Sequence, residues 1–343
     1  MAFKFSVGPW NVHEGMDPYG PEVRKTLSLE EKVEKFAVLG ISAVQFHDDD
    51  VVPNINELSR DEVLEETRKV KSLLDRYGLK AEFVAPRLWM DPHTVDGAFT
   101  SNAKEDMAYA EYRALLSIDM AKTLDCNLVG LWLAREGTLC PESKDPVEAI
   151  KKIISAINKM LAYDDKIKIF IEPKPNEPVD RSYIGTMGHV MAIAAETIDP
   201  SRVGGLVESA HAILAGLDPS NEMAIALALG KLYGVHLNDQ NGLKFDQDKS
   251  FGVENLRQAF NQIKVLVEND FGINGEYIGL DVKAMRTTND ENAFKHIENS
   301  IKIAKALEDK VRRYDYEYQK DCIINRDYEA LEMYVINLLM GLV

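Results

Sequence analysis

Acidic residues and one histidine stand at the ends of four successive short apolar runs in the second half of the sequence. Glu172 ends IFIE, Glu208 ends GLVE, His236 ends GVH and Asp281 follows IGL. A charged side chain at the end of a buried run is unfavourable unless a partner compensates it. One such residue is more often a partner in an ion pair than a metal ligand, but four in succession favour a shared divalent cation.

Nearby residues could extend this set of ligands. Glu208 and His211 form a Glu-x-x-His pair, which can bring a carboxylate and an imidazole to one cation. Asp246 and Asp248 alternate along FDQD and can chelate the same ion. Oxygen ligands favour Mg²⁺, Mn²⁺ or Co²⁺ over structural zinc, and the histidines favour Mn²⁺ or Co²⁺ among these. The full set suffices for two cations, with Glu208 as the bridging ligand: Glu172, Glu208, His211, His236, Asp246, Asp248 and Asp281.

The elements that must position these residues follow an alternating pattern. Short apolar runs alternate with longer amphipathic stretches, which is typical of βαβ units and a parallel sheet. Eight strands are expected, at 5–9, 43–46, 81–85, 128–132, 167–171, 203–207, 232–237 and 277–280. Helical stretches between them include 28–40, 59–78, 145–164 and 254–270. Eight such units, with no GxGxxG after the first, predict an α/β fold of the closed (β/α)8 TIM barrel type, whose catalytic groups lie where strands end.

The barrel is expected to occupy residues 1–307 as one catalytic domain. Residues 308–343 follow the eighth unit and are expected to form a short C-terminal helical extension. Its last part, YEALEMYVINLLMGLV, carries an apolar stripe. That stripe fits packing on the outside of the barrel or a contact between subunits.

Composition restricts the classes of partner. The 343 residues include 56 acidic and 40 basic ones, for a formal net charge of −16. Such a charge repels nucleic acid and anionic membranes, so neither is expected as a partner. No apolar run reaches the roughly 18 residues of a membrane span, and MAFKFSVGPW lacks the features of a secretory signal, so a cytoplasmic location is expected. The three cysteines have no CxxC spacing and are interpreted as reduced thiols.

Seven segments closely resemble the motifs of xylose isomerases, in the same order and at similar separations. They are FHDDDVVP, DPHTVDGAFTSN, AREG, IEPKPNEP, ESAHAILAG, NDQNGLKFDQDKSFG and LDVKAMRT. The resemblance implies a metal-dependent aldose–ketose isomerase that moves a hydride between C1 and C2 of a monosaccharide. It also implies two divalent cations per subunit (Mn²⁺, Co²⁺ or Mg²⁺), no organic cofactor, and a homotetramer or homodimer.

The resemblance implies a role for each matching residue. Ligands of a structural cation would be Glu172, Glu208 and Asp281, with His236 at the fourth position. Ligands of a catalytic cation would be Glu208, His211, Asp246 and Asp248. Catalytic groups would be Lys174, which binds a sugar oxygen near C1, and His47 with Asp50, which assist ring opening. Substrate-binding aromatic residues would be Trp10, Trp89 and Trp132, with Tyr19 lent by a neighbouring subunit.

Without the resemblance, His47 could be a loop histidine bound to the adjacent acidic run, and Lys174 a surface lysine. Each tryptophan is equally well explained by core packing.

Departures from the xylose isomerase pattern leave the sugar undefined. His236 stands where these enzymes carry an aspartate, which is similar to rhamnose isomerases, and Ala85 and Leu206 replace polar residues. Alternative functions are a ketose epimerase or a C-glycoside-cleaving enzyme on the same barrel, a metal-dependent phosphodiesterase, and a sugar-binding protein without turnover. The acidic charge disfavours the phosphodiesterase, and the ligands for a second cation disfavour the others.

Overall fold

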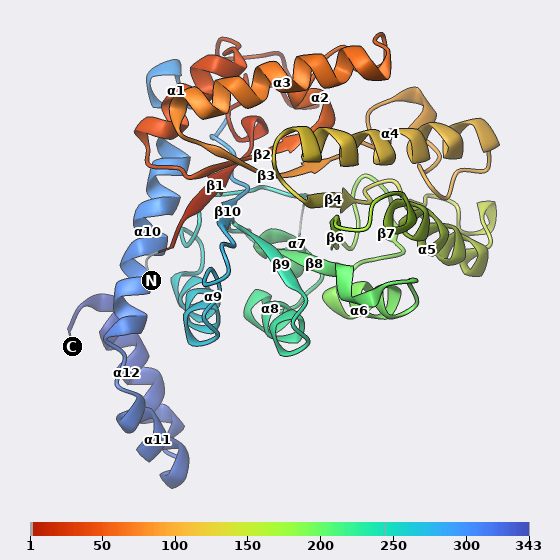
Figure 1. Cartoon of the computed structure of the whole chain (residues 1–343). Coiled ribbons are helices and arrows are strands. Elements are labelled where there is room, and N and C mark those ends of the chain that lie inside the picture. The colour runs from red at the N-terminus through yellow and green to blue at the C-terminus, as the bar shows by residue number, and fades with distance from the viewer. Residues whose placement is uncertain (1–2, 244, 343) are drawn as a thin grey trace.

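Eight parallel strands close into a barrel in the computed structural model, which describes residues 3–243 and 245–342 (Figure 1). Around the barrel the strand order is β1-β10-β9-β8-β6-β4-β3-β2. The strands are β1 (Phe5–Val7), β2 (Ala43–His47), β3 (Lys80–Ala85), β4 (Leu128–Trp132), β6 (Lys168–Glu172), β8 (Val203–Glu208), β9 (Leu232–Leu237) and β10 (Ile278–Leu280). This arrangement confirms the expected TIM barrel.

Most of the helices surround the barrel, whereas the short α7 (Ser209–Leu214) lies over its centre in Figure 1. The helices are α1 (Leu29–Val38), α2 (Asp48–Val51), α3 (Arg60–Tyr77), α4 (Lys104–Thr123), α5 (Pro146–Tyr163), α6 (Met187–Ala195), α7, α8 (Pro219–Ala228), α9 (Leu256–Glu268) and α10 (Lys295–Arg312). Ser28 and Ser59 begin α1 and α3 with capping boxes, and the Asp145 side chain accepts hydrogen bonds from the first turn of α5. These caps explain why the helices begin where the sequence pattern indicated.

Strands β5 (Gly137–Thr138) and β7 (Arg181–Ser182) form a small antiparallel pair outside the barrel sheet. They join the loops that follow β4 and β6. The two loops at this end of the barrel are therefore held to each other.

Buried apolar side chains form a large cluster that includes barrel and helix residues, and a smaller one. The smaller cluster consists of Phe83, Ala85, Phe170 and Leu206, and Trp10 packs against it. The Phe83 ring lies 6.1 Å from that of His236. Ala85 and Leu206, which depart from the family pattern, are thus part of an apolar layer close to the candidate ligands.

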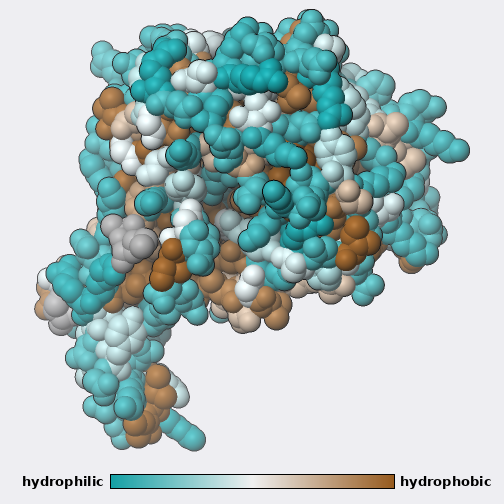
Figure 2. All heavy atoms as spheres, viewed as in Figure 1, coloured by the Kyte–Doolittle hydropathy of each residue, from teal (hydrophilic) through white to brown (hydrophobic). Residues whose placement is uncertain are grey.

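The C-terminal helices α11 (Tyr316–Asn325) and α12 (Tyr328–Met340) form an arm that extends away from the barrel (Figure 1). The expected boundary at 307/308 lies inside α10, and the division into two domains stays a prediction. Val335 and Leu338 of the arm are buried, whereas Ile324 and Met340 are exposed. Figure 2 shows hydrophobic side chains on this arm. Over the described residues, no helix is both long and apolar enough to cross a membrane.

Candidate functional site

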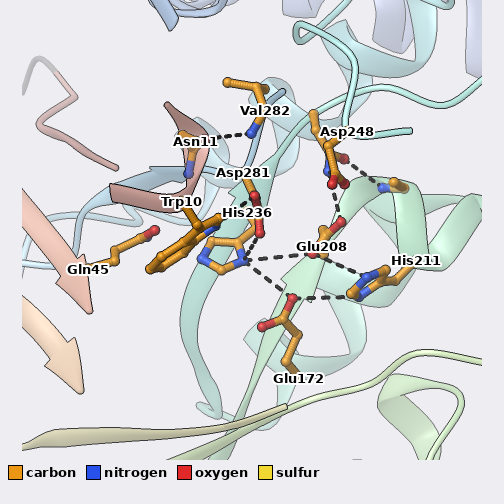
Figure 3. A network of polar contacts seen from close by, with 12 residues as sticks. Trp10, Asn11, Gln45, Glu172, Glu208, His211, His236, Asp248, Asp281 and Val282 are labelled. Atoms are coloured by element: carbon orange, nitrogen blue, oxygen red, sulfur yellow. Dashed lines mark hydrogen bonds and ion pairs between the residues drawn. The ribbon is translucent and has the colours of Figure 1, made fainter. Parts of the chain in front are cut away.

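The side chains at the ends of four neighbouring strands meet at one mouth of the barrel (Figure 3). Glu172 ends β6, Glu208 ends β8, His236 is the penultimate residue of β9, and Asp281 follows β10. Each offers one ligand atom, and these atoms all lie within 4.8 Å of one another. His236 Nδ1 is 3.3 Å from Glu172 Oε1, 3.8 Å from Glu208 Oε2 and 3.7 Å from Asp281 Oδ2. We call these four residues the first ligand group.

A second ligand group of Glu208, His211 and Asp246 lies beside the first and shares Glu208 with it. Glu208 is the last residue of β8 and the residue before α7, so His211 lies on the first turn of that helix. His211 Nε2 is 3.3 Å from Glu208 Oε2 and 3.1 Å from Asp246 Oδ2, which comes from the loop after β9. The Glu-x-x-His spacing thus places both side chains on one side of the turn.

Asp248 lies next to this second ligand group but belongs to neither group. Its Oδ1 accepts a hydrogen bond from Asn238 Nδ2 at 3.0 Å, and the same amide donates to Glu208 Oε1 at 2.8 Å. Its carboxylate also forms an ion pair with Lys283. A role for Asp248 as a ligand stays a prediction.

The charges in the two ligand groups are incompletely matched by protein donors. Burial raises the pKa of Glu208 and of Asp281. Burial also disfavours the charged form of Glu172, but the His236 and His211 rings outweigh it and lower the Glu172 pKa to about 2. The pKa of His236 lies well above 6.5 because Glu172 and Asp281 outweigh the effect of burial. The imidazoles are therefore the groups that favour the charged form of the neighbouring carboxylates, against the effect of burial.

Buried polar atoms without hydrogen bonds indicate what could complete the site. Asp246 Oδ1 and His211 Nδ1 are buried and make no hydrogen bond within the described part of the chain, and His211 Nδ1 has an ion-pair contact with Glu172 Oε1 at 3.5 Å. Native proteins seldom leave such atoms unpaired. Carboxylate and imidazole donors held this closely are the ligands of divalent cations such as Mn²⁺ and Co²⁺. The residues therefore fit a metal centre.

A polar layer lies beneath the His236 ring. Gln45 Nε2 donates to Ser6 Oγ at 3.2 Å and to Glu82 Oε2 at 3.0 Å, and all three side chains are buried. A Cβ atom on Gly279 would be 2.4 Å from Gln45 Nε2 and 3.0 Å from His236 Cδ2. The Gln45 amide and the edge of the His236 ring therefore both lie next to the position that a side chain on Gly279 would occupy. Gln45 and His236 are labelled in Figure 3.

The three tryptophans extend the site along one side. Trp10 Nε1 donates to Asp281 Oδ1 at 2.9 Å, and the Trp10 ring centroid is 4.3 Å from that of His47. The His47 ring is 5.0 Å from Trp89, and Trp89 is 4.3 Å from Trp132. These rings form a continuous aromatic wall beside the first ligand group.

Lys174 lies between this wall and the second ligand group. Its ammonium nitrogen is 3.0 Å from Asp246 Oδ2, 3.0 Å from Glu177 Oε2 and 5.2 Å from the centroid of the Trp132 ring. The side chain is 6% exposed, which distinguishes it from an ordinary surface lysine. Its ammonium group can donate a hydrogen bond to an oxygen bound at this mouth.

His47 ends β2 and approaches Asp50 one turn later in α2. His47 Nδ1 is 3.0 Å from Asp50 Oδ2. Arg87 also contacts both residues, and sequence reasoning did not single it out. The run of three aspartates at 48–50 was a signal that a buried cation lies nearby.

The structure does not bring Tyr19 to the other candidate residues. Tyr19 lies in the loop between β1 and α1, and 96% of its surface is exposed. Its contribution to the pocket of a neighbouring subunit stays a prediction.

Known proteins share both sequence and fold with this chain. The family model for the xylose isomerase-like TIM barrel matches residues 33–268. Xylose isomerases of Thermus thermophilus and Thermus caldophilus are 34% and 33% identical over 297 residues, which cover 85% of this chain and 75% of each relative. Two solved structures share the fold over 90% of this chain: a D-tagatose 3-epimerase-like protein (TM-score 0.65, 19% identity, 99% of that chain) and a D-psicose 3-epimerase from Clostridium cellulolyticum H10 (TM-score 0.61, 12% identity, 98% of that chain).

Proposed function

This chain belongs to the xylose isomerase-like TIM barrel family, and from that premise we propose that it is a metal-dependent isomerase that interconverts an aldose and its ketose. One observation carries the proposal beyond the family. The second ligand group, Glu208, His211 and Asp246, lies beside the first and shares a carboxylate with it. Two adjacent groups that share a ligand could hold two neighbouring cations, which would stabilise charge on the oxygens of the two carbons between which the hydride moves.

We assign the ligands as follows. Glu172, Glu208, His236 and Asp281 would hold one divalent cation, and Glu208, His211 and Asp246, with Asp248 beside them, would hold the other. When bound, the cations would stabilise negative charge on the sugar oxygens at C1 and C2. The two histidines favour Mn²⁺ or Co²⁺ over Mg²⁺.

The remaining residues would bind and orient a monosaccharide. Lys174 would donate a hydrogen bond to the oxygen near C1, and Asp246 and Glu177 hold its ammonium group in place for this. His47 and Asp50 would handle the proton that moves when the sugar ring opens. Trp10, Trp89 and Trp132 would pack against the sugar and exclude water from the reacting carbons.

The first test is incubation of the full-length protein with a panel of aldoses and ketoses in the presence of Mn²⁺, Co²⁺ or Mg²⁺. We expect at least one aldose to be converted to its ketose, as detected by NMR of the product mixture. No interconversion of any pair under any metal would rule out the isomerase.

Lys174→Ala tests the assigned chemistry. We expect it to fold yet lose turnover by about 10²-fold or more, the size typical of removing one charge-stabilising donor. Lys151→Ala, which removes an exposed lysine of α5 paired with Glu148, is the matched control and should keep full activity. An unchanged rate in Lys174→Ala would reduce Lys174 to a scaffolding role.

A ketose epimerase is the second candidate because the first ligand group is complete by itself, with three carboxylates and one histidine. One cation would then suffice. Mass spectrometry of the native protein decides between the two: two tightly bound ions per chain favour the isomerase and one favours the epimerase. The sugar panel gives an independent answer, because an epimerase changes one ketose into another and forms no aldose.

A further inference from the structure

Arg87 reaches from the loop after β3 to the acidic run that follows β2. Its Nε donates to Asp49 Oδ1 at 2.7 Å, and its Nη2 donates to Asp50 Oδ1 at 3.0 Å. The same Nη2 is 2.9 Å from His47 Nδ1. The guanidinium carbon lies 5.3 Å from the centroid of the Trp89 ring, so Arg87 is in contact with the aromatic wall as well.

His47 Nδ1 therefore has two neighbours with opposite hydrogen-bonding roles. Asp50 Oδ2, at 3.0 Å, can only accept a hydrogen bond, and Arg87 Nη2 can only donate one. Nδ1 can donate to the carboxylate or accept from the guanidinium, but not both. If Nδ1 carried a hydrogen, two N–H groups would face each other across 2.9 Å.

Asp50 does not need the imidazole as a donor. Its Oδ2 already accepts a hydrogen bond from the His47 backbone amide at 3.0 Å, and its Oδ1 accepts one from Arg87. With the hydrogen on Nε2 instead, both hydrogens of Arg87 Nη2 find acceptors, one in Asp50 Oδ1 and one in His47 Nδ1. This tautomer satisfies both hydrogens of Arg87 Nη2. It leaves Nδ1 facing a second acceptor, Asp50 Oδ2, at 3.0 Å, but that oxygen already receives the hydrogen bond of the His47 backbone amide.

We propose that Arg87 is a positioning residue, which donates to His47 Nδ1 and so holds the imidazole hydrogen on Nε2. Over the described residues Nε2 makes no hydrogen bond to the protein, and its ring lies between Trp10 and Trp89 in the aromatic wall. The meaning of this arrangement rests on the function proposed above: His47 meets a sugar oxygen as a hydrogen-bond donor.

The same arrangement restrains ring opening. For Nε2 to accept the proton of the anomeric hydroxyl, Nδ1 must carry a hydrogen and donate it to Asp50. Arg87 must first release Nδ1. The contact with the guanidinium thus determines whether His47 Nε2 donates a hydrogen bond to the sugar or accepts one. In a His–Asp pair without the arginine, the carboxylate alone would determine this.

The tautomer can be read directly by NMR. Long-range ¹H–¹⁵N correlation spectra of the full-length protein, labelled at histidine and free of sugar, distinguish an imidazole with its hydrogen on Nε2 from one with it on Nδ1. His47→Gln assigns the signals by their loss. We expect Nε2 to carry the hydrogen in the unmodified protein. In Arg87→Met we expect the hydrogen on Nδ1 instead, because Asp50 is then the only partner of Nδ1. The ¹⁵N signals of Nδ1 and Nε2 should then show the pattern of the opposite tautomer.

Arg135→Met is the matched control, since Arg135 donates to the backbone oxygen of Trp89 at 3.2 Å instead of contacting the imidazole. It should leave the His47 signals unchanged. A hydrogen on Nδ1 in the unmodified protein would overturn the proposal, and this spectrum decides even if Arg87→Met fails to fold. An unchanged pattern in folded Arg87→Met would overturn it too. The spectra are recorded without sugar, so the position of the hydrogen on His47 can be determined even if the protein isomerises no sugar. Failure of the proposed function and failure of this proposal are therefore distinguishable.

Discussion

Carboxylates are buried in two different ways at the same end of the barrel. Asp48 is fully buried, and both its oxygens are bound by donors: the backbone amides of Asp49 and Arg87 at 2.9 and 3.0 Å, and the guanidinium of Arg113 at 2.7 Å. Glu208 is 2% exposed, yet its closest donor is the Asn238 amide at 2.8 Å, and its other neighbours are imidazoles and further carboxylates.

The difference separates scaffolding from a binding site. Glu136 resembles Asp48, because the backbone amides of Phe99 and Thr100 bind its carboxylate at 2.7 and 3.2 Å. Burial is therefore shared by all three residues and does not by itself mark a functional group. What marks Glu208 is that the protein supplies few donors to it, as is expected of a carboxylate that can serve as a ligand for a cation.

The largest expected effect comes from Glu208→Gln. Loss of the carboxylate shared by both ligand groups should reduce isomerisation by about 10³-fold or more, since metal-ion stabilisation supplies several kcal/mol. In metal-free protein, however, the free energy of unfolding should stay the same or rise, because one charge leaves a crowded acidic group. Kinetic assays and urea unfolding measure the two quantities. A large loss of metal-free stability would place Glu208 with Asp48.

Asp48→Asn should show the opposite behaviour. It leaves the buried Arg113 guanidinium without its charged partner, and we expect a loss of about 3–5 kcal/mol in the free energy of unfolding. Urea titration measures this loss. The double variant with Arg113→Met should lose less than the sum of the two single variants, because they remove the same interaction. A loss below about 1 kcal/mol would contradict the scaffolding role.

His296 provides a buried group that is neutral in the folded protein. Burial lowers its pKa to about 4, and its Nε2 donates to the Asn11 backbone oxygen at 2.8 Å. Between pH 6.5 and 4 the unfolded chain binds a proton that the folded chain does not. Stability from this residue is therefore complete above pH 6.5 and falls toward pH 4, by roughly 3 kcal/mol in total.

His296→Gln should reduce this pH dependence. Carboxylates also titrate in this range, so the difference between variant and unmodified protein is the informative quantity. We expect the unfolding free energy of His296→Gln to fall less between pH 7 and pH 4.5, as measured by urea titration at both values. Equal losses in the two proteins would contradict the assignment.

The smallest expected effect is stabilisation by the metal itself. After treatment with a chelator, Mn²⁺ at about 100 times its Kd should add about 2.7 kcal/mol to the unfolding free energy. Thermal unfolding with and without Mn²⁺ measures the shift. Glu208→Gln should lose most of this stabilisation by Mn²⁺, and Glu136→Gln should keep it.

Asp248→Asn tests the one predicted ligand that lies outside both groups. If this variant is stabilised by Mn²⁺ as much as the unmodified protein, Asp248 is not a ligand.

The sequence predicted the barrel because its strands are short apolar runs with charged ends. Strands β4 and β9 have the expected bounds, and β6 differs from its expectation by one residue at each end. The pair β5–β7 could not be predicted in this way, because each strand has two residues and no alternating pattern. Its formation depends on two loops that the barrel brings together.

Four of the candidate ligands were visible because each stands at a strand end, and His211, Asp246 and Asp248 were visible because of their spacing along the chain. These are properties that can be read from the sequence alone. Arg87, Asn238 and Gln45 were not, because their roles depend on partners from other strands. Gln45, for example, is a single amide within AVQFH and acquires its role only from Ser6 and Glu82. A glutamine inside an otherwise apolar run was nevertheless a signal that a polar partner lies within the barrel.

Gly279 has a consequence for how this protein can evolve. Even an alanine there would bring its methyl group against the Gln45 amide and 2.3 Å from the Val235 backbone oxygen. Because the Val235 oxygen belongs to the backbone, its contact would persist whatever residues stand at 45 and 236, so glycine is expected at 279 in homologues that keep this strand register. A homologue with an aspartate at 236 would lose only the contact of the imidazole, and the Gln45 and Val235 contacts would still exclude a side chain at 279.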